Sequence, residues 1–390
     1  MNTNRAGKYV KTVNGFSAYV PNPLPPVPRI QFSSELVSLL SRADQKLGRL
    51  DGIVEFLPNP DLFVAMYVQK EALLSSQIEG TQASFVDVLE AAKDIQDRNS
   101  DAHEVINYMS AMEYAFDRLI ELPLSLRLIR ETHKVLLQSG RGSAKTPGEF
   151  RASQNWIGPS GSTPDTAVYI PPSVDDMKLA MGDLEKFLHT EDNLPALVKI
   201  ALVHAQFETI HPFLDGNGRM GRLLITFWLT QQGILTKPLL YLSYYFKLYR
   251  NEYYEKLMDI RFKGAWEEWL EFFLGGVIFV ADEAVASAKE IIELKSNLSQ
   301  QLTLRHPSSN NHQRLLEYLF TRPMLVRYEA SEALSISQPT ANRIVDEFVN
   351  EGILSDLTPG QSRNKRFLFS KYMSIIEKGT TTDTFLSSEY

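Results

Sequence analysis

The sequence contains no cysteine among its 390 residues, which excludes a disulfide framework and thiolate chemistry. Long apolar runs are also missing: no stretch of eighteen or more residues is apolar throughout, so no membrane-spanning helix is expected. The N-terminus lacks the pattern of basic residues followed by an apolar run that marks a secretory signal. We therefore expect a cytoplasmic protein that does not enter a membrane.

The charge balance is mildly acidic, with 47 Asp and Glu residues against 40 Lys and Arg residues and a formal net charge of -7. This balance argues against indiscriminate binding of nucleic acid, although a local basic face remains compatible with it. Hydrophobic residues make up 44% of the chain, which is ample for a core. The length leaves room for two or three domains.

The most informative stretch runs from residue 211 to residue 222 and reads His-Pro-Phe-Leu-Asp-Gly-Asn-Gly-Arg-Met-Gly-Arg. An apolar helical run over residues 194–210 precedes it, and a second one over residues 223–232 follows it. The stretch is therefore expected to be a loop that opens a helix. Free backbone N–H groups and the positive end of the helix dipole favour an anion at such a place.

The side chains of this stretch supply the groups that nucleotide transfer requires. His211 is a proton acceptor near neutral pH, and Asp215 is a hard carboxylate ligand for Mg2+. Arg219 and Arg222 supply guanidinium forks for phosphate oxygens. An amide donor and two residues that let the backbone approach a ligand complete the set: Asn217, Gly216 and Gly218. A plain turn between two helices does not need this combination.

This stretch resembles the signature of the Fic family, His-Pro-Phe-x-Asp-Gly-Asn-Gly-Arg-x-Gly-Arg, and contains every fixed position of it. The chain from about residue 60 to about residue 275 resembles the all-α Fic core. The resemblance implies a protein adenylyltransferase, which transfers AMP from ATP to a hydroxyl side chain of a target protein. His211 would then deprotonate the hydroxyl, and Asp215 would hold Mg2+. The implied nucleotide-binding residues are Gly216, Asn217, Gly218, Arg219, Met220, Gly221 and Arg222.

A helix is expected from residue 61 to residue 80, with Asp61 as N-cap and Gly80 as stop. It ends in Ser-Ser-Gln-Ile-Glu-Gly, in which Ser75 and Glu79 lie four residues apart and so share one helix face. The ending resembles the inhibitory-helix motif of Fic proteins, Ser/Thr-x-x-x-Glu-Gly/Asn. The resemblance implies that Glu79 pairs with Arg222, occupies the group that would hold the γ-phosphate, and keeps the enzyme autoinhibited.

Helical periodicity lapses after residue 140, in a segment rich in Gly, Pro, Ser and Thr. Two short strand-like pieces, residues 154–157 and 167–170, flank its tip. A long irregular segment in a compact domain is usually functional. This one resembles the flap of Fic proteins, a β-hairpin over about residues 154–170 that pairs with the target backbone. Trp156 and Tyr169 are expected to anchor the flap.

A further site residue is assigned by resemblance alone. Tyr254, in Tyr-Tyr-x-x-Leu, matches the family tyrosine that lies against the nucleotide and is our candidate for the adenosine end. His133 is expected to be structural. Polar pairing in the core is the expected role of His204 and Glu208, and lining of the site is the alternative.

The remaining regions divide the chain into an N-terminal arm with a first helix (residues 1–60), the Fic core (61–302), a winged helix-like domain (311–372) and a tail (373–390). The proline-rich stretch 20–28 should be extended. The first helix is expected over residues 34–50, with Ser33 or Ser34 as cap and Gly52 as stop. Further core helices are expected over residues 84–96, 102–119, 125–138, 174–188 and 266–298.

Beyond a linker near residues 304–311, three short helices (313–320, 327–334 and 338–350) precede two strands within residues 352–369. This order resembles a winged helix-turn-helix, with Ser337 as cap of the recognition helix. The cations that could meet phosphates are Arg343, Arg363, Lys365 and Arg366. Acidic residues balance their charge, so that DNA binding and protein docking stay open for this domain.

The overall expectation is a mainly α protein: an all-α Fic core with a β-hairpin flap, plus a small C-terminal winged helix-turn-helix domain. Its expected partners are ATP, a target protein, and DNA or protein at the C-terminal domain. A homodimer fits the family, although no residue points to it. The alternatives are a DNA-binding regulator with a Fic sensor core, use of another nucleotide, and removal of AMP with Glu79 orienting a water.

Overall fold

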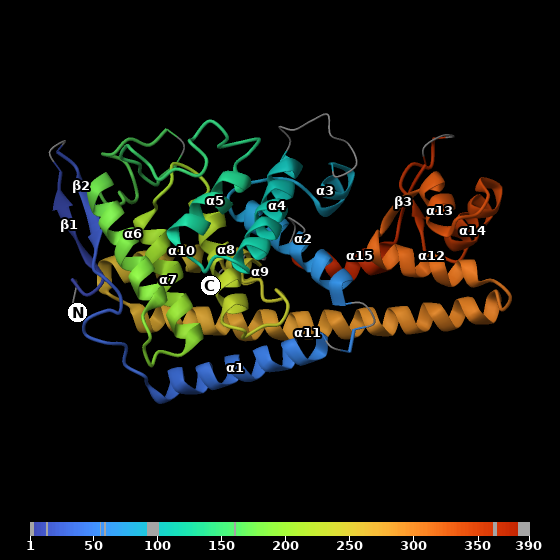
Figure 1. Cartoon of the computed structure of the whole chain (residues 1–390), viewed down its shortest axis with the longest axis horizontal. Helices are drawn as coiled ribbons and strands as arrows, with labels where there is room; N and C mark the ends of the chain where they lie inside the picture. The colour runs from blue at the N-terminus through green and yellow to red at the C-terminus, as the bar shows by residue number, and fades with distance from the viewer. Residues whose placement is uncertain are drawn as a thin grey trace, which may run out of the picture.

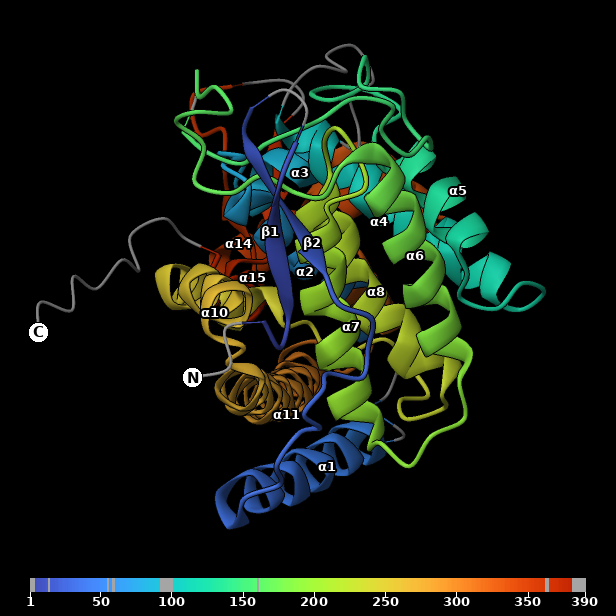
Figure 2. The same ribbon diagram turned by 90° about the vertical axis from the view of Figure 1, so that its left-hand side faces the viewer.

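The computed structural model describes residues 4–12, 15–54, 56–57, 60–91, 101–159, 161–361 and 365–380. The fold is mainly helical, as the sequence predicts, and its longest helix is α11 (Trp266–Arg305), which runs along the length of the molecule (Figure 1). Helix α1 (Ser34–Val54) lies against α11, as the view along α11 in Figure 2 shows. Among the described residues, no helix combines the length and apolar character needed to cross a membrane.

Two buried helices at the centre of the fold carry the motif. Helix α7 (Ala196–Ile210) is buried from its second residue to its last, which is why its sequence is apolar on nearly every face. Helix α8 (Asn217–Gln231) packs against it. The surrounding helices are α2 (Pro60–Ile78), α3 (Phe85–Ala91), α4 (Asp101–Leu119), α5 (Leu126–Leu136), α6 (Val174–His189), α9 (Ser243–Leu248) and α10 (Arg250–Lys263).

The helix boundaries differ from the predicted ones at a few points. Helix α1 continues through Gly52 to Val54, because burial of Val54 offsets the modest cost of a glycine inside a helix. Asp61 lies in the first turn of α2 and is not its cap, since the helix already begins at Pro60. The cap of α1 is Ser33, whose hydroxyl accepts from the Leu36 N–H. The predicted helix over residues 84–96 ends outside the described residues.

The N-terminal arm is not a tail: it forms an antiparallel hairpin of β1 (Gly7–Lys11) and β2 (Ser17–Pro21). The signal that could have predicted it is the Asn-Gly pair at positions 14 and 15 between two pieces of alternating polarity. Tyr19 is buried beneath the hairpin, and its N–H donates to the Ile170 carbonyl at 2.9 Å. Strand β2 of the hairpin is therefore hydrogen-bonded to the end of the flap segment.

The C-terminal unit stands at the opposite end of α11 from the N-terminal hairpin (Figure 1). Its three helices agree closely with the prediction: α12 (Asn310–Thr321), α13 (Arg327–Leu334) and α14 (Gln338–Asn350). Its antiparallel sheet has the order β3-β5-β4, with β3 (Met324–Val326), β4 (Ser355–Asp356) and β5 (Arg366–Leu368). The sequence prediction lacked β3. The linker before the unit is shorter than predicted, because α11 continues to Arg305. The interpretation of the unit as a winged helix stays a prediction.

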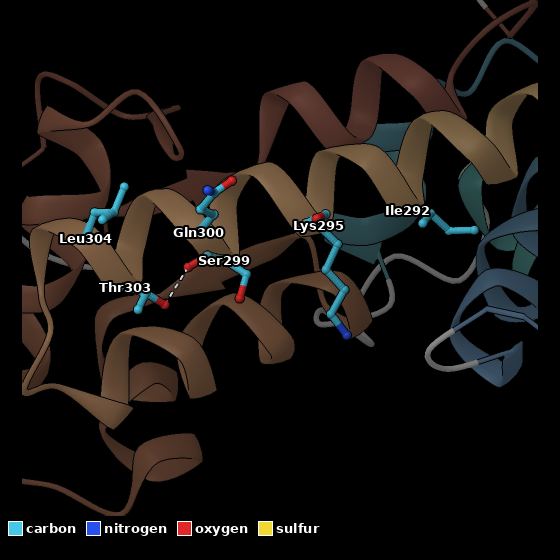
Figure 3. A pocket seen from close by; sticks show the side chains of 7 residues that line it. Ile292, Lys295, Ser299, Gln300, Thr303 and Leu304 are labelled. Atoms are coloured by element: carbon cyan, nitrogen blue, oxygen red, sulfur yellow. Dashed lines mark hydrogen bonds between the residues drawn. The ribbon is translucent and has the colours of Figure 1, made fainter.

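The last half of α11 is open on one side. It borders a hollow of about 520 Å3 whose lining, among the residues that the structure describes, comes from α11 and includes Lys295 and Gln300 (Figure 3). The Gln313 amide of α12 donates to the carbonyl of Ser299, one of the residues that line the hollow, at 2.8 Å. The end of α11 thus carries the C-terminal unit away from the core.

The predicted tail over residues 373–390 is wrong for its first part. Helix α15 (Ser370–Ile376) buries Tyr372, Met373 and Ile376 and packs against α11 and α2. The chain then continues as an ordered turn to Thr380, which is buried. The apolar spacing of Tyr372, Met373 and Ile376 is the helical signal that the prediction missed. Residues 381–390 lie outside the described part of the chain.

The N-terminal arm gives a testable prediction about stability. Arg5 binds both carboxylate oxygens of Glu267, at 2.6 and 2.8 Å, and the Gln31 N–H donates to the same carboxylate. Burial alone would raise the pKa of Glu267, but these hydrogen bonds outweigh it and lower the pKa. At pH 7, Glu267→Gln should lower the free energy of unfolding by about 2 kcal/mol, the size of a charge-assisted hydrogen bond.

Urea unfolding of both proteins across pH measures this effect. Because the folded-state pKa of Glu267 is lowered, its contribution is complete above the unfolded-state pKa of about 4.3 and is lost as the pH falls further. The difference between the two proteins should therefore shrink on acidification below this value. The matched control is Glu268→Gln, which changes an exposed neighbour. An equal effect of both substitutions would contradict the prediction.

Candidate active site

His211 lies at the end of α7 in a left-handed backbone conformation, with φ 50° and ψ 61°. This conformation is unfavourable for a residue with a Cβ and needs support from its surroundings. Arg151 supplies this support. Its side-chain Nε donates to the His211 carbonyl at 3.1 Å, and its backbone N–H donates to the Pro212 carbonyl. The Asn155 amide donates to the same His211 carbonyl at 3.3 Å. Arg151, just before the flap, and Asn155, within it, therefore hold His211 in place. No local sequence pattern predicts this role for them.

The imidazole of His211 is suited to accept a proton. Its Nδ1 is buried and has no hydrogen-bond partner among the described residues. Burial lowers its pKa to about 4, and the positive charge of Arg261 acts in the same direction, while Glu79 opposes both. The ring is therefore neutral at pH 7.

Asn217 and Phe213 close the loop that follows His211. The Asn217 side chain accepts from the Phe213 N–H at 2.8 Å and donates to the Phe213 carbonyl at 2.9 Å. The Asn217 side-chain amide, which we expected to face a phosphate, thus holds the loop together. Only the backbone N–H of Asn217 remains to bind an anion. The helix begins at Asn217 with Gly216 as its N-cap, so the predicted loop over residues 211–222 is loop only up to Gly216.

His133 supports this loop from below, a role that the sequence did not indicate. Its ring stacks on Phe213 with a centroid distance of 3.6 Å, and its Nε2 lies 2.9 Å from the Asp215 carbonyl. Its Nδ1 accepts from the Gly148 N–H, which leaves Nε2 as the donor. Burial lowers the pKa of His133 to about 4, so the ring stays neutral and both bonds persist at pH 7. His133 therefore fixes the backbone beside Asp215.

Arg222 is buried and faces the end of α2. Its Nη2 donates to a Glu79 carboxylate oxygen at 2.8 Å and to the Ser75 carbonyl at 3.0 Å. Its Nε donates to the Ser75 hydroxyl at 2.8 Å. Burial would raise the pKa of Glu79, but Arg222 outweighs it and lowers the pKa. The structure thus brings together the two residues that the sequence resemblance paired.

The carboxylate of Glu79 also touches the N-terminus of α8. A Cβ on Gly218 would lie only 2.2 Å from the Glu79 Oε1, so no other residue fits at this position while the carboxylate is there. The oxygen therefore sits where an anion meets the free N–H groups of a helix N-terminus. Glu79 occupies a site that suits a phosphate oxygen.

Asp215 and Arg219 face each other beside this position. Asp215 accepts from the Gly216 N–H through one oxygen, at 2.6 Å, and is partly exposed. A single, partly exposed carboxylate suits Mg2+ that is held mainly by the phosphates of a nucleotide. Arg219 is buried with its Nη1 3.4 Å from Glu104 and its Nη2 3.6 Å from Asp215, and its Nε and Nη2 have no hydrogen-bond partner among the described residues. A phosphate that binds Nη2 would compete with Asp215 for it.

Two signature residues serve the packing of α7 on α8. The Met220 side chain is fully buried in the core, so only its backbone can meet a nucleotide. A Cβ on Gly221 would lie 2.3 Å from the Glu208 carboxyl, which explains why a glycine is needed there. His204 is a core residue, as expected: it bonds to the Gly221 carbonyl and to the Tyr253 hydroxyl, at 2.8 and 2.9 Å.

Glu208 and Tyr254 lie near Arg222. Burial raises the pKa of Glu208 to about 7, and Arg222 opposes the shift. One Glu208 oxygen has no hydrogen-bond partner among the described residues. Tyr254 is 39% exposed, with the Arg250 guanidinium 5.4 Å from its ring centre, whereas Tyr253 is buried. An exposed ring beside the arginines is compatible with the adenosine end, and this assignment stays a prediction.

The flap is less regular than the predicted hairpin. Its two predicted strands reduce to one antiparallel bridge between Ile157 and Tyr169, because the Gly and Pro residues of the segment interrupt regular pairing. Tyr169 anchors the flap as expected, with its hydroxyl donating to the Thr209 carbonyl at 2.7 Å. Trp156 does not: it is exposed, and its indole N–H donates to Ser162 within the flap.

Comparisons with known proteins agree with this geometry. A model of the Fic/DOC family N-terminal region matches residues 37–117, and a model of the Fic/DOC family matches residues 123–229. The protein adenylyltransferase Fic of Drosophila grimshawi is 33% identical over 163 residues, which are 40% of this chain and 32% of that protein. The one of Drosophila mojavensis is 33% identical over 206 residues, or 50% and 38%. The chain thus spans about a third of these relatives.

A solved structure shows the same fold over most of the chain. It is a Fic family protein from Desulfovibrio desulfuricans G20, which has a TM-score of 0.58, 22% identity, and coverage of 87% of this chain and 97% of that chain. The matched regions include the helix that carries Glu79 and the loop that carries His211. The chain is therefore a member of the Fic family.

Proposed function

We propose that the protein is a protein adenylyltransferase, which transfers AMP from ATP to a hydroxyl side chain of a target protein, and that the structure is its autoinhibited state. The observation that carries the proposal is the position of the Glu79 carboxylate between Arg222 and Gly218, where a phosphate would lie. The names of the Drosophila relatives, protein adenylyltransferase Fic, support the same chemistry.

The proposed reaction uses His211 as general base. Its neutral ring takes the proton of the target hydroxyl, and the oxygen attacks the α-phosphorus of ATP. The bond from the α-phosphorus to the bridging oxygen breaks, and pyrophosphate leaves. Arg219, Arg222 and the N–H groups of the first turn of α8 would position the phosphates and stabilise their charge. Asp215 would hold Mg2+, which would supply positive charge to neutralise the phosphates.

The proposed inhibition follows from competition for one guanidinium. While Glu79 holds Arg222, the γ-phosphate has no partner there, and the chain of phosphates cannot align with His211. The Ser75 hydroxyl and carbonyl hold the same guanidinium and keep it turned toward α2. Removing the Glu79 carboxylate should therefore free Arg222 without moving it.

The alternative of a DNA-binding regulator receives little support from the C-terminal unit. Arg343 pairs with Glu347, Lys365 with Asp356, and Arg366 with Glu90 of α3. Arg363 lies outside the described residues. Since the three described cations already have carboxylate partners, binding to phosphates would require these pairs to break. Docking of a protein remains the better proposal for this unit.

The main experiment is transfer of label from α-labelled ATP with Mg2+. Glu79→Gly should label a target protein, or the enzyme itself, at least about tenfold more strongly than the wild type, because Arg222 becomes available to the γ-phosphate. The double variant Glu79→Gly, His211→Ala should abolish the label, since it removes the base.

Two outcomes would count against the proposal. If Glu79→Gly labels no more than the wild type, Glu79 does not inhibit. If no labelling occurs with any variant, the reaction or the nucleotide is wrong, and the same assay with γ-labelled ATP or UTP distinguishes these cases. Ser76→Ala is a matched control, because it changes α2 beside the contact and leaves the bonds of Arg222 in place.

The pKa of His211 predicts the pH dependence. In Glu79→Gly, the second-order rate constant of labelling with respect to ATP should rise with pH only up to about pH 5 and should then be flat through pH 7. The reason is that burial lowers the pKa of His211 to about 4, so the basic form is complete well below neutral pH. The Glu79 charge, which raises this pKa, is absent from the variant. A rise centred near pH 6.5 would contradict the assignment.

His133 predicts a positioning effect. In the Glu79→Gly background, His133→Phe keeps a ring on Phe213 but removes the bonds to the Asp215 carbonyl and the Gly148 N–H. We expect labelling to slow about tenfold, which corresponds to about 1.4 kcal/mol. The Mg2+ concentration for half-maximal labelling should rise as well, because Asp215 is less well placed. His133→Gln, which retains a donor, should recover part of both effects, and an unchanged Mg2+ requirement would exclude this role.

A further inference from the structure

Glu79 follows directly on the last turn of α2, and this end of the helix is held by groups from three distant parts of the chain. Arg250 of α10 donates to the Ile78 carbonyl at 3.2 Å, and Arg141 donates to the Glu79 carbonyl at 3.2 Å. These contacts satisfy the free carbonyls at a helix C-terminus and suit its negative dipole end. The third group is the end of the described chain, residues 377–380, which follows α15.

Residues 377–380 meet α2 at Gln77, two positions before Glu79. The Gln77 amide donates to the Thr380 carbonyl at 3.2 Å and to the Ala83 carbonyl at 3.0 Å. It accepts from the Lys247 ammonium at 2.7 Å. Lys247 also donates to the carbonyls of Gly379 and Thr380, at 3.3 and 3.4 Å. We call this contact, formed by Lys247, Gln77 and residues 377–380, the C-terminal latch.

The latch holds a desolvated cation with neutral acceptors only. Lys247 has no carboxylate partner among the described residues, and burial lowers its pKa to about 8. Two of its three acceptors are the backbone carbonyls of Gly379 and Thr380. A buried donor that loses its acceptor costs free energy, so Lys247 and Gln77 depend on residues 379–380 for their own positions.

Residues 377–380 follow a path that specific contacts define. Gly379 has φ 81°, and a Cβ there would lie 1.9 Å from the Tyr244 ring of α9. Before it, Lys378 pairs with Glu290 of α11, at 2.6 Å. Helix α15 packs against both α11 and α2 and leads directly into the latch. The C-terminal unit is therefore joined to the turn that carries Glu79 by a short, ordered piece of chain.

We propose that the C-terminal latch keeps the last turn of α2 in place, and that the C-terminal unit thereby sets how firmly Glu79 holds Arg222. Displacement of residues 377–380 from Gln77 releases the turn, and Glu79 leaves the phosphate position. This inference rests on the proposed function for its consequence, because Glu79 must be the inhibitor. The mechanical part of it, the stabilisation of the turn, does not.

Two point variants open the latch without touching the active site. Gly379→Ala places a Cβ against Tyr244 and should displace the chain end, and Lys247→Met removes the ammonium that joins the chain end to Gln77. Their matched controls are Gly360→Ala, where a Cβ meets nothing within 4 Å, and Lys289→Met, which changes an exposed lysine. Lys247→Arg retains a cation with several donors and serves as the rescue variant.

Amide hydrogen exchange of full-length proteins without nucleotide measures the mechanical part. We expect exchange in residues 77–81 to be about tenfold faster in Gly379→Ala and Lys247→Met than in the wild type. Exchange in α7 should be unchanged, which separates local release from global destabilisation. Both controls should match the wild type, and Lys247→Arg should recover at least part of the protection. Unchanged exchange in residues 77–81 of both latch variants overturns the proposal.

Label transfer from α-labelled ATP then measures the consequence. Both latch variants should label several-fold more than the wild type but less than Glu79→Gly, and they should add nothing in the Glu79→Gly background. Fast exchange without increased labelling, while Glu79→Gly labels strongly, overturns the regulatory role of the latch. If Glu79→Gly itself does not label, the proposed function has failed, and the exchange result still decides whether the latch holds the turn.

Discussion

The structure depends on the need of one buried arginine for an anion. Arg222 is 3% exposed in the second turn of α8, and an arginine keeps its charge at any pH that the fold tolerates. A buried charge without a partner would cost several kcal/mol, so some anion must lie beside it. Glu79 is that anion in the structure, and the Ser75 hydroxyl fixes the direction of the fork. Exchange of Glu79 for a phosphate would keep the arginine paired throughout.

The surrounding helices fix the positions of Arg222 and of the loop that carries His211. Gly221 lets α7 and α8 approach until Glu208 touches the helix backbone, and Gly218 leaves room for an anion at the N-terminus of α8. On the opposite side, Arg151 and His133 hold the backbone on either side of the loop that joins the two helices. Because these contacts connect five separate segments, the arrangement of His211 and Arg222 is a property of the whole core.

The sequence predicted what is encoded locally. Periodicity placed most helices within a few residues. The resemblance of the α2 ending and of the signature to Fic proteins implied the pairing of Glu79 with Arg222. Contacts between residues far apart in the chain could not be predicted from the sequence. His133 looks like any histidine on an amphipathic helix, and nothing near Arg151 indicates that it binds the loop around His211. The role of Asn217 differed because a side chain amide can turn to its own loop as well as to a ligand. The missed N-terminal hairpin had a local signal in its Asn-Gly pair.

The tethering of Glu79 makes small contacts at the end of α2 important. A group on the same chain acts at an effective concentration of about millimolar or more, so in the proposed inhibition a free nucleotide would not readily displace it. What can change is the free energy that keeps the last turn of α2 folded. Three hydrogen bonds of residues 379–380 to Gln77 and Lys247, at about 1 kcal/mol each, sum to about 3 kcal/mol. Since 1.4 kcal/mol is about tenfold in an equilibrium, the loss of about half of this free energy would raise the population of the released turn about tenfold. A contact far from His211 is therefore large enough to decide whether the phosphate position is occupied.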